Sequence, residues 1–174
     1  AYRRQGLAAG RMRARWVVAA NPAVSVPRSG AARAALGKLD LFVVSEVVAS
    51  TDTSSARPHV LLPAAAWGEK DGTVTNSERC ISRQRRFLPL AGEARPDWWI
   101  LKEVARALGH GVGFDYEGPA DIFREHARLS GFENAGQRFF DISGLAGLSD
   151  DQYDTLEPVQ WPVNGSGSDS RRLF

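Results

Sequence analysis

Three strand-length apolar segments, the first two joined by an amphipathic helix, constrain the first third of this chain. The segments are 15–22 (RWVVAANP), 39–46 (LDLFVVSE) and 59–63 (HVLLP). Short runs rich in Val, Leu and Phe that end in turn-forming or polar residues are typical of buried β-strands. Between the first two segments, residues 29–38 (SGAARAALGK) repeat their apolar positions at helical spacing. This alternation predicts an α/β fold, with a partial parallel (Rossmann-like) sheet, flanking helices and a right-handed crossover.

A β-hairpin extension is expected next. Asp71-Gly72 is a strong hairpin turn pair, and it separates the segments 64–70 (AAAWGEK) and 73–79 (TVTNSER). The segment that follows, 80–90 (CISRQRRFLPL), predicts another strand with its basic side chains on a solvated face.

Two amphipathic helices and a shorter one are expected in the second half of the chain. Asp97 is a suitable N-cap for a helix that Gly109 ends. A second helix runs from about 119 to 130, and a short one begins near Ser149. The side chains expected to face inward are Ile100, Leu101, Val104 and Leu108 in the first helix and Ile122, Phe123 and Leu129 in the second.

These elements divide the chain into four segments. We predict a βαβ segment of the nucleotide-binding type in residues 1–63, the β-hairpin extension in 64–95, and a helical region that completes the domain in 96–163. The Gly- and Ser-rich residues 164–174 predict a flexible linker toward a missing C-terminal domain. The basic start has no apolar signal core and no initiator methionine, so we expect both ends to be cut from a longer protein.

Composition excludes several classes of protein. Hydrophobic residues make up 43% of the 174 residues, which is enough for a core and excludes a disordered chain. The 22 Lys and Arg residues are nearly balanced by 20 Asp and Glu residues, so no strong positive field points to nucleic acid. No apolar run is long enough to span a membrane. The single cysteine, Cys80, excludes an internal disulfide and a cysteine-built metal site, and it favours a reducing compartment.

Polar side chains follow the first two predicted strands. Asn21 comes after the first strand, and Ser45 and Glu46 end the second. Ligands of open parallel sheets bind outside the carboxyl ends of the strands, so these three residues are candidate ligand contacts. The glycine fingerprint of NAD and FAD sites does not follow the first strand, which disfavours those cofactors. The alternative is that Asn21 caps a turn and Glu46 is solvated.

Four segments of the chain resemble the molybdopterin oxidoreductase family, and within it the bacterial assimilatory nitrate reductases. They are VVSE, VLLPAAAWGEKDGTVTNSER, ISRQR and GEARPDWW. The resemblance runs from Trp16 to Val163 and implies a bis(molybdopterin guanine dinucleotide) molybdenum cofactor. Family members also carry a four-cysteine site for a 4Fe-4S cluster and a ligand residue on molybdenum. This chain has neither, so the resemblance implies an internal segment, with the cluster in the full-length protein only.

The resemblance also implies which residues contact the cofactor. The family's contacts carry over to Asn21, Ser45, Glu46, Lys70 and Asp97. Asn21 and Ser45 can form hydrogen bonds with the diphosphate or ribose. Glu46 can accept hydrogen bonds from ribose hydroxyls or guanine. Lys70 can offset diphosphate charge, and the Asp97 carboxylate can accept from guanine N–H donors. The alternatives are a solvated hairpin lysine for Lys70 and a plain helix cap for Asp97.

No catalytic residue and no metal ligand is assigned within this chain. The resemblance makes the family-like residues Thr73, Thr75, Asn76, Glu78 and Arg79 structural, ordering the hairpin. Cys80 stands where the family commonly has a second arginine, and it is either a redox thiol beside Arg79 or a passive strand residue. We also expect an exposed apolar patch that involves Trp67 and one of Trp98 and Trp99.

The implied function is that of a cytoplasmic, molybdenum-dependent oxidoreductase of nitrate assimilation that reduces nitrate to nitrite. Its expected partners are the remaining domains of the same polypeptide and an electron-donor protein or reductase subunit that feeds the iron-sulfur cluster. No nucleic acid and no membrane is expected as a partner. Two alternatives stay open: part of a formate dehydrogenase alpha subunit, or a non-catalytic nucleotide-binding or interaction domain. An upstream four-cysteine motif in the full-length protein would favour either enzyme over the binding domain.

Overall fold

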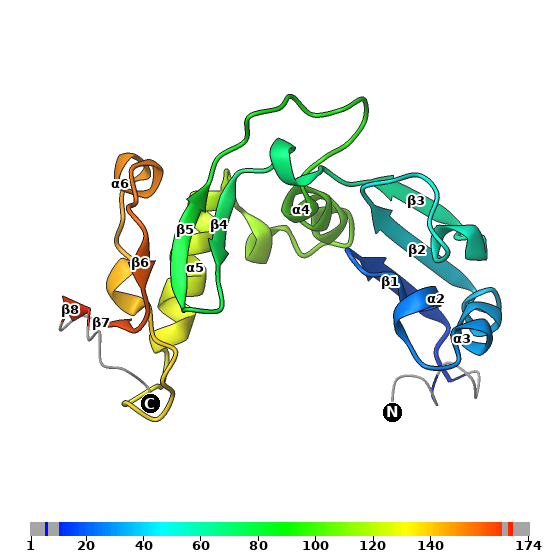
Figure 1. The fold of residues 1–174 in the computed structure, drawn as a ribbon, viewed down its shortest axis with the longest axis horizontal. Coiled ribbons are helices and arrows are strands. Elements are labelled where there is room, and N and C mark those ends of the chain that lie inside the picture. Colours follow the sequence, from blue (N-terminus) through cyan, green and yellow to red (C-terminus); the bar gives the residue numbers. More distant parts are fainter. Residues whose placement is uncertain (1–5, 7–10, 165–166, 169–174) are drawn as a thin grey trace. The chain divides into compact units, whose positions relative to one another are not determined.

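The computed structural model describes residue 6 and residues 11–164 and 167–168, and it divides into two compact units. Unit 1 is drawn from Ala1–Glu69 and Leu88–Val104, and unit 2 from Lys70–Phe87 and Ala105–Phe174. Figure 1 shows the elements of each unit. Within the described residues, no helix is long and apolar enough to cross a membrane.

Unit 1 contains a three-stranded parallel sheet. Its strands are β1 (Ala14–Val18), β2 (Leu41–Glu46) and β3 (Val60–Pro63), in the order β1-β2-β3. All three predicted strands are therefore confirmed, as is the predicted α/β fold with a partial parallel sheet. β2 is the central strand of this sheet (Figure 1).

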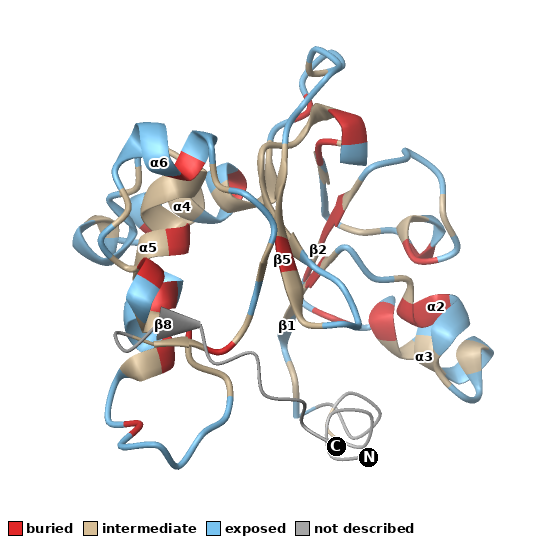
Figure 2. Cartoon of the chain, turned by 60° about the vertical axis from the view of Figure 1, so that its left-hand side comes forward, coloured by how far each residue is buried: buried red, intermediate tan, exposed pale blue. Residues whose placement is uncertain are grey.

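The core of unit 1 covers one face of this sheet. Residues Phe42 and Val44 of β2 are fully buried, and Figure 2 shows buried residues along this strand. They pack with Val17, Leu36, Leu39 and Ala56. Leu36 ends α3 (Ser29–Leu36), which confirms the helix predicted there, and a shorter helix, α2 (Pro22–Ser25), precedes it. Successive strand residues point to opposite faces, so Leu41 lies on the other face, where it is 45% exposed.

A short parallel bridge extends the sheet beyond β3. Ala64 pairs with Arg95, and the N–H of Arg95 donates to the carbonyl of Pro63 at 3.1 Å. Helix α4 (Asp97–Ala107) follows this bridge. The carbonyl of Pro96 accepts from the N–H groups of the third and fourth residues after it, so Asp97 is the first helical residue. The prediction of Asp97 as the N-cap is therefore wrong by one residue, since Pro96 holds that position.

The buried stripe predicted for α4 is only partly correct. Ile100 is buried at 7% exposure, and Val104 is half-buried. Leu101 is 41% exposed because the residue next to Ile100 points about 100° away around the helix. Leu108 is 69% exposed and lies beyond the last residue of the helix.

Unit 2 contains an antiparallel sheet of order β4-β5-β6. Its strands are β4 (Gly72–Thr75), β5 (Cys80–Gln84) and β6 (Val159–Gln160). The hairpin turn lies at 76–79, so the predicted turn at Asp71-Gly72 is wrong. Oδ1 of Asn76 accepts from the N–H groups of Glu78 and Cys80, both at 2.9 Å, and these bonds hold the turn at this place. The structural interpretation of Asn76 is confirmed.

Helices of unit 2 pack on this hairpin sheet. Helix α5 (Pro119–Gly131) and helix α6 (Asp150–Asp154) confirm the two predicted there, and Ser149 caps α6. The core consists of Ile81, Phe123, Ala127, Ile142, Leu145 and Tyr153. Phe123 faces inward as predicted and Ile122 is half-buried, but Leu129 is 59% exposed because Ala127 and Ser130 occupy the inner face.

Short elements complete the chain. The single-turn 3-10 helices are η1 (Ser54–Ala56), η2 (Trp67–Glu69), η3 (Gly111–Phe114) and η4 (Ser143–Leu145). Strands β7 (Val163–Asn164) and β8 (Gly167–Ser168) form a two-stranded sheet. The predicted linker 164–174 otherwise lies outside the described residues.

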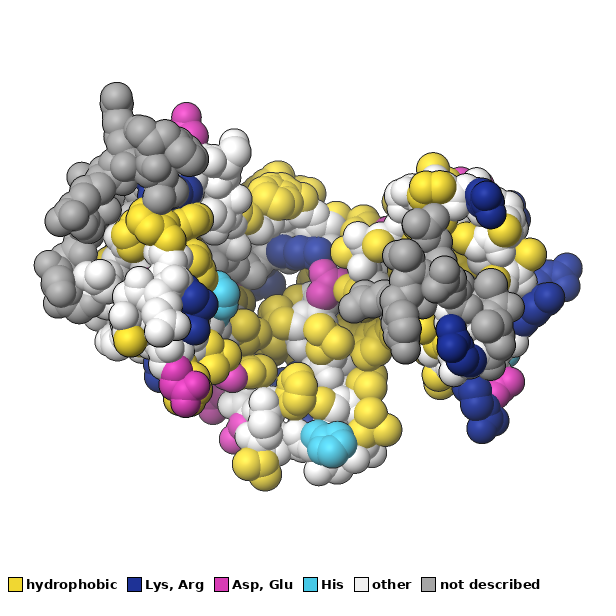
Figure 3. Space-filling view, turned by 90° about the horizontal axis from the view of Figure 1, so that it is seen from below, with side chains coloured by type: hydrophobic (Ala, Val, Ile, Leu, Met, Phe, Trp, Pro, Cys, Tyr) yellow, Lys and Arg dark blue, Asp and Glu magenta, His cyan; other side chains and the backbone are white. Residues whose placement is uncertain are grey.

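Large apolar side chains are exposed in both units. Figure 3 shows hydrophobic side chains at the surface. Trp67 is 65% exposed and Trp99 is 38% exposed, whereas Trp98 is half-buried. The predicted exposure of Trp67 and of one of the two adjacent tryptophans is confirmed.

Gly131, the last residue of α5, is expected to tolerate no side chain. A Cβ at this position would lie 2.6 Å from Cβ of Ser143 and 2.9 Å from its hydroxyl oxygen. Gly131→Ala should lower the free energy of unfolding by about 1–3 kcal/mol, although alanine is the better helix former. Gly113→Ala is the matched control, because nothing lies within 4 Å of a Cβ there. Urea unfolding of both variants measures the difference, and equal midpoints would contradict this packing.

Acid should weaken unit 2 through Asp141. Hydrogen bonds from the side chain and backbone of Ser143, and from the Asn134 amide, hold the pKa of the Asp141 carboxyl below its ordinary value. A lowered folded-state pKa contributes stability above the unfolded-state pKa of about 3.9, and this contribution is lost as pH falls through the folded-state pKa. Asp141→Asn should therefore melt at a lower temperature than wild type at pH 7, and the gap should shrink on acidification. Thermal melts between pH 7 and pH 2 check the sign, and a constant gap would refute it.

Candidate functional site at the carboxyl edge of the parallel sheet

The carboxyl ends of the unit 1 strands lie at one edge of the sheet. Val18 of β1 is in register with Ser45 of β2, and Glu46 is in register with Pro63 of β3. The bridge between Ala64 and Arg95 continues this edge beyond β3. Four of the five predicted site residues, Asn21, Ser45, Glu46 and Asp97, therefore end or follow parallel segments of the same sheet.

Ser45 is committed to a contact within the fold. Its side chain is buried at 1% exposure, and its hydroxyl accepts from Nε1 of Trp16 at 2.8 Å. This bond fixes the indole of β1 against β2. The predicted ligand contact of Ser45 stays a prediction, and a ligand would have to reach the hydroxyl past this indole.

Glu46 is the last residue of β2 and accepts two hydrogen bonds. Its Oε1 accepts from the N–H of Val47 at 2.9 Å, and its backbone carbonyl accepts from the N–H of Ala64 at 3.0 Å. Because the carboxylate has a second oxygen, Glu46 can also accept from a ligand hydroxyl. The next residues, Val47 and Val48, are 49% and 53% exposed and give this edge an apolar part.

Asn21 is held by a residue that the sequence analysis missed. Thr53 is fully buried, and its hydroxyl donates to Oδ1 of Asn21 at 2.6 Å. The same hydroxyl oxygen accepts from the N–H of Ala23 at 3.1 Å. The signal that could have found Thr53 is the hydroxyl-rich segment 50–55 (STDTSS), which follows β2 on the ligand side of the sheet.

Asp97 and Lys70 lie in different units. Asp97 opens α4 in unit 1, where a negative charge is favourable at the helix N-terminus, and its Oδ1 is buried. Two residues before it, the Arg95 guanidinium stacks 5.8 Å from the centre of the Trp99 ring. Lys70 is half-buried and belongs to unit 2, immediately before Asp71 and β4. Its predicted cofactor contact stays a prediction.

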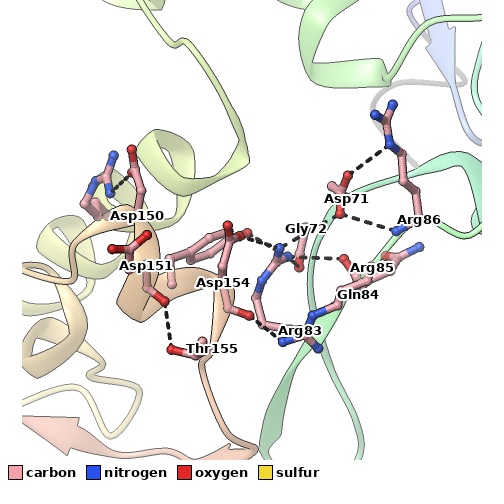
Figure 4. Close-up of polar contacts among 12 residues, drawn as sticks. Asp71, Gly72, Arg83, Gln84, Arg85, Arg86, Asp150, Asp151, Asp154 and Thr155 are labelled. Carbon is pink, nitrogen blue, oxygen red and sulfur yellow. Dashed lines mark hydrogen bonds and ion pairs between the residues drawn. The ribbon is translucent and has the colours of Figure 1, made fainter.

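Unit 2 has a charged cavity of about 770 Å³ that the sequence analysis did not anticipate. Arg83 is its most buried charged group, with a side chain that is 5% exposed. Its guanidinium lies 4.2 Å from the centre of the Tyr153 ring and donates to Asp154 at 3.1 Å (Figure 4). Arg124 donates to Asp150 at 2.8 Å. Burial raises the pKa of the Tyr153 phenol.

The charges around this cavity compensate one another. Its lining contains four arginines and five acidic residues. Figure 4 shows Arg83 paired with Asp154 and Arg86 paired with Asp71. The run RQRR at 83–86 is the sequence signal for this network. A cavity without excess positive charge is a poor site for an anion. We therefore interpret its ion pairs as interactions that stabilise unit 2. Among the residues that the structure describes, no group of three His, Cys, Asp or Glu side chains could hold a metal ion.

Known proteins resemble this chain along most of its length. It is 56% identical over 157 residues to a nitrate reductase of Klebsiella oxytoca, a match that covers 90% of this chain and 18% of that protein. A nitrate reductase of Shewanella frigidimarina is 43% identical, with 97% of this chain and 18% of that protein covered. The chain therefore spans less than a fifth of the relatives it matches.

One solved structure has a similar fold, and one family model matches more than half of the chain. Acetylene hydratase from Pelobacter acetylenicus has a similar fold, with a TM-score of 0.65 at 16% identity over 95% of this chain and 21% of that one. The model of the molybdopterin oxidoreductase family matches residues 2–107, which is more than half of the chain. The parallel sheet, its carboxyl edge and α4 up to Ala107 all lie within that match. The chain belongs to the molybdopterin oxidoreductase family.

Proposed function

We propose that this chain forms part of a guanine dinucleotide site in a molybdenum-dependent nitrate reductase. The observation that carries the proposal is the arrangement of Asn21, Glu46 and Asp97 after parallel segments of one sheet, at the edge where ligands of such sheets bind. The family's cofactor, a molybdopterin, supports this assignment. The bis(molybdopterin guanine dinucleotide) form of the cofactor is part of the proposal.

The polar groups at this edge fit the parts of such a cofactor. A diphosphate requires N–H donors, which the amide of Asn21 can provide. Ribose hydroxyls require an acceptor, which Glu46 provides, and the adjacent N–H groups of guanine suit the carboxylate of Asp97. Lys70 would reduce the net charge of the diphosphate. When bound, the cofactor supplies two-electron chemistry at molybdenum, whereas the residues of this chain bind and orient it.

The activity of the whole protein is proposed from its relatives. Identity of 56% to a nitrate reductase supports reduction of nitrate to nitrite. A 4Fe-4S cluster, an electron-donor protein or reductase subunit, contacts with further domains of the same polypeptide and a cytoplasmic location complete the proposal. The chain spans 18% of that relative, and we assign no substrate-selecting group within it.

The 174-residue chain by itself should be inert. The reason is that no residue of this chain is assigned as a molybdenum ligand or as a ligand of the iron-sulfur cluster. Purified chain incubated with nitrate, a chemical electron donor and added cofactor should form no nitrite above a denatured control. Nitrite formation at a rate proportional to chain concentration would overturn the proposal that this chain provides only a cofactor-binding part.

Asp97→Asn in the full-length enzyme tests the guanine contact. Asparagine replaces one carboxylate oxygen with an N–H donor, which would face the N–H donors of guanine at a cost of about 1–3 kcal/mol. The helix terminus loses only a charge interaction, about 0.3–1 kcal/mol. We therefore expect less guanine nucleotide released per protein, with little change in the melting temperature of the cofactor-free protein.

Asp40→Asn is the matched control for this measurement. Asp40 directly precedes β2, at the opposite edge of the same sheet, and its carboxylate is exposed beside Arg13. It should leave the cofactor content at the wild-type level. Normal cofactor content in Asp97→Asn would remove Asp97 from the site and leave it as a residue of the first helical turn.

A further inference from the structure

We infer that Thr53 is a positioning residue that turns the amide of Asn21 so that its N–H donors face the ligand, and that Asn21 therefore binds a phosphate oxygen. The inference rests on the proposed function, which left Asn21 with either the diphosphate or the ribose as its partner. It adds a residue, Thr53, that acts through Asn21 and need not touch the cofactor itself.

The first step concerns the hydrogen of the Thr53 hydroxyl. A threonine hydroxyl has one hydrogen to donate and can accept two. The N–H of Ala23 donates to the Thr53 oxygen at 3.1 Å, and the hydroxyl donates to Oδ1 of Asn21 at 2.6 Å. Thr53 is fully buried, so its hydrogen needs an acceptor within the protein. With the amide of Asn21 reversed, Nδ2 would face Thr53, and the hydroxyl hydrogen would have no acceptor among its contacts in the described residues.

The second step follows from the orientation of this amide. With Oδ1 bound by Thr53, Asn21 keeps two N–H donors on Nδ2 for other partners. Its backbone carbonyl is already occupied by the N–H groups of Val24 and Ser25, at 3.0 and 2.9 Å. Asn21 therefore presents the two N–H donors of Nδ2 to a ligand, and these donors suit a ligand acceptor. Phosphate oxygens are charged acceptors, whereas Glu46 suits the hydrogens of ribose hydroxyls.

The hydrogen bonds of Thr53 join the turn after β1 to the loop after β2. Asn21 and Ala23 belong to the turn after β1, and Thr53 belongs to the loop after β2. That second loop has its own support, because the Thr51 N–H donates to the Ser54 hydroxyl at 2.7 Å and the Ser54 N–H donates to the Thr51 hydroxyl at 3.0 Å. Loss of the Thr53 hydroxyl should therefore release Asn21 while the loop keeps its local structure.

The test compares guanosine diphosphate with guanosine as calorimetric probes of the 174-residue chain. Thr53→Val keeps the volume of the side chain and removes both hydrogen bonds, and it should weaken guanosine diphosphate binding about tenfold, the loss equivalent to about 1.4 kcal/mol. Guanosine, which has no phosphate, should bind the variant as it binds wild type. Thr53→Ser restores the hydroxyl and should restore the affinity for guanosine diphosphate.

Two further variants separate the role of Thr53 from a general loss of structure. Asn21→Asp keeps an oxygen that accepts from the Thr53 hydroxyl but removes the N–H donors. It should therefore lower the affinity for guanosine diphosphate at least about tenfold and leave the affinity for guanosine unchanged. Thr155→Val removes a similar hydroxyl, which donates to the carbonyl of Asp151 at 2.7 Å in unit 2, and should change neither affinity.

Hydrogen exchange of the Ala23 amide without ligand gives an independent measurement. Exchange should accelerate in Thr53→Val and stay at the wild-type rate in Thr53→Ser and Asn21→Asp, since both keep the bond from Ala23 to Thr53. Unchanged exchange in Thr53→Val would show that Thr53 does not hold the turn after β1 and would overturn its positioning role.

The binding outcomes distinguish this inference from the proposed function. If wild type binds neither probe, the chain has no guanine dinucleotide site, and both proposals fall. If wild type binds both probes and Thr53→Val binds guanosine diphosphate equally well, the inference falls and the proposed function stands. If Asn21→Asp lowers the affinity for guanosine as much as the affinity for guanosine diphosphate, Asn21 contacts the nucleoside and its assignment to the phosphate falls.

Discussion

The parallel pairing of β2 with a neighbour on each side is the constraint on which unit 1 depends. Parallel strands all present their carboxyl ends at the same edge, so residues as far apart in sequence as Asn21 and Asp97 follow segments that end at one edge of the sheet. The register is fixed by one-sided burial, because Phe42 and Val44 are fully buried and a slip by one residue would expose both. Core packing and site geometry are therefore set by the same strand.

The sequence predicted the elements of this fold better than their contacts. β1, β2, β3 and α3 follow from apolar periodicity and local turn residues, which are properties of short windows. The hairpin turn was misplaced because Asp71-Gly72 is the stronger local signal, whereas the turn that forms depends on two hydrogen bonds that the side-chain oxygen of Asn76 accepts from the N–H groups of Glu78 and Cys80. Leu129 was assigned to the core from the helical spacing of large apolar residues. In the structure the small residue Ala127 lies on the inner face of the helix instead, which the spacing of large residues does not predict.

The sequence predicted which residues lie at the candidate site but not the hydrogen bonds that they form. Strand ends can be found from a sequence, so Asn21, Ser45 and Glu46 could be named. Their partners could not: Trp16 is 29 residues from Ser45, and Thr53 is 32 residues from Asn21. Such separations leave no periodic trace in the sequence, yet they bring the indole of Trp16 to the hydroxyl of Ser45 and the hydroxyl of Thr53 to Oδ1 of Asn21. The charged cavity of unit 2 depends on similar long-range pairs, since Arg83 and Asp154 are 71 residues apart.

These partners also bear on how the proposed nucleotide site would bind a phosphate without a glycine-rich loop. In glycine-rich sites, backbone N–H groups at the start of a long helix hold the phosphates. Here the turn after β1 leads into α2, which has only four residues and begins with a proline that has no N–H. A short helix has a weak dipole, and one of its N–H groups, that of Ala23, is already bound to Thr53. The amide of Asn21, whose oxygen is held by the buried hydroxyl of Thr53, is therefore the phosphate donor that we propose at this turn in place of a glycine-rich loop.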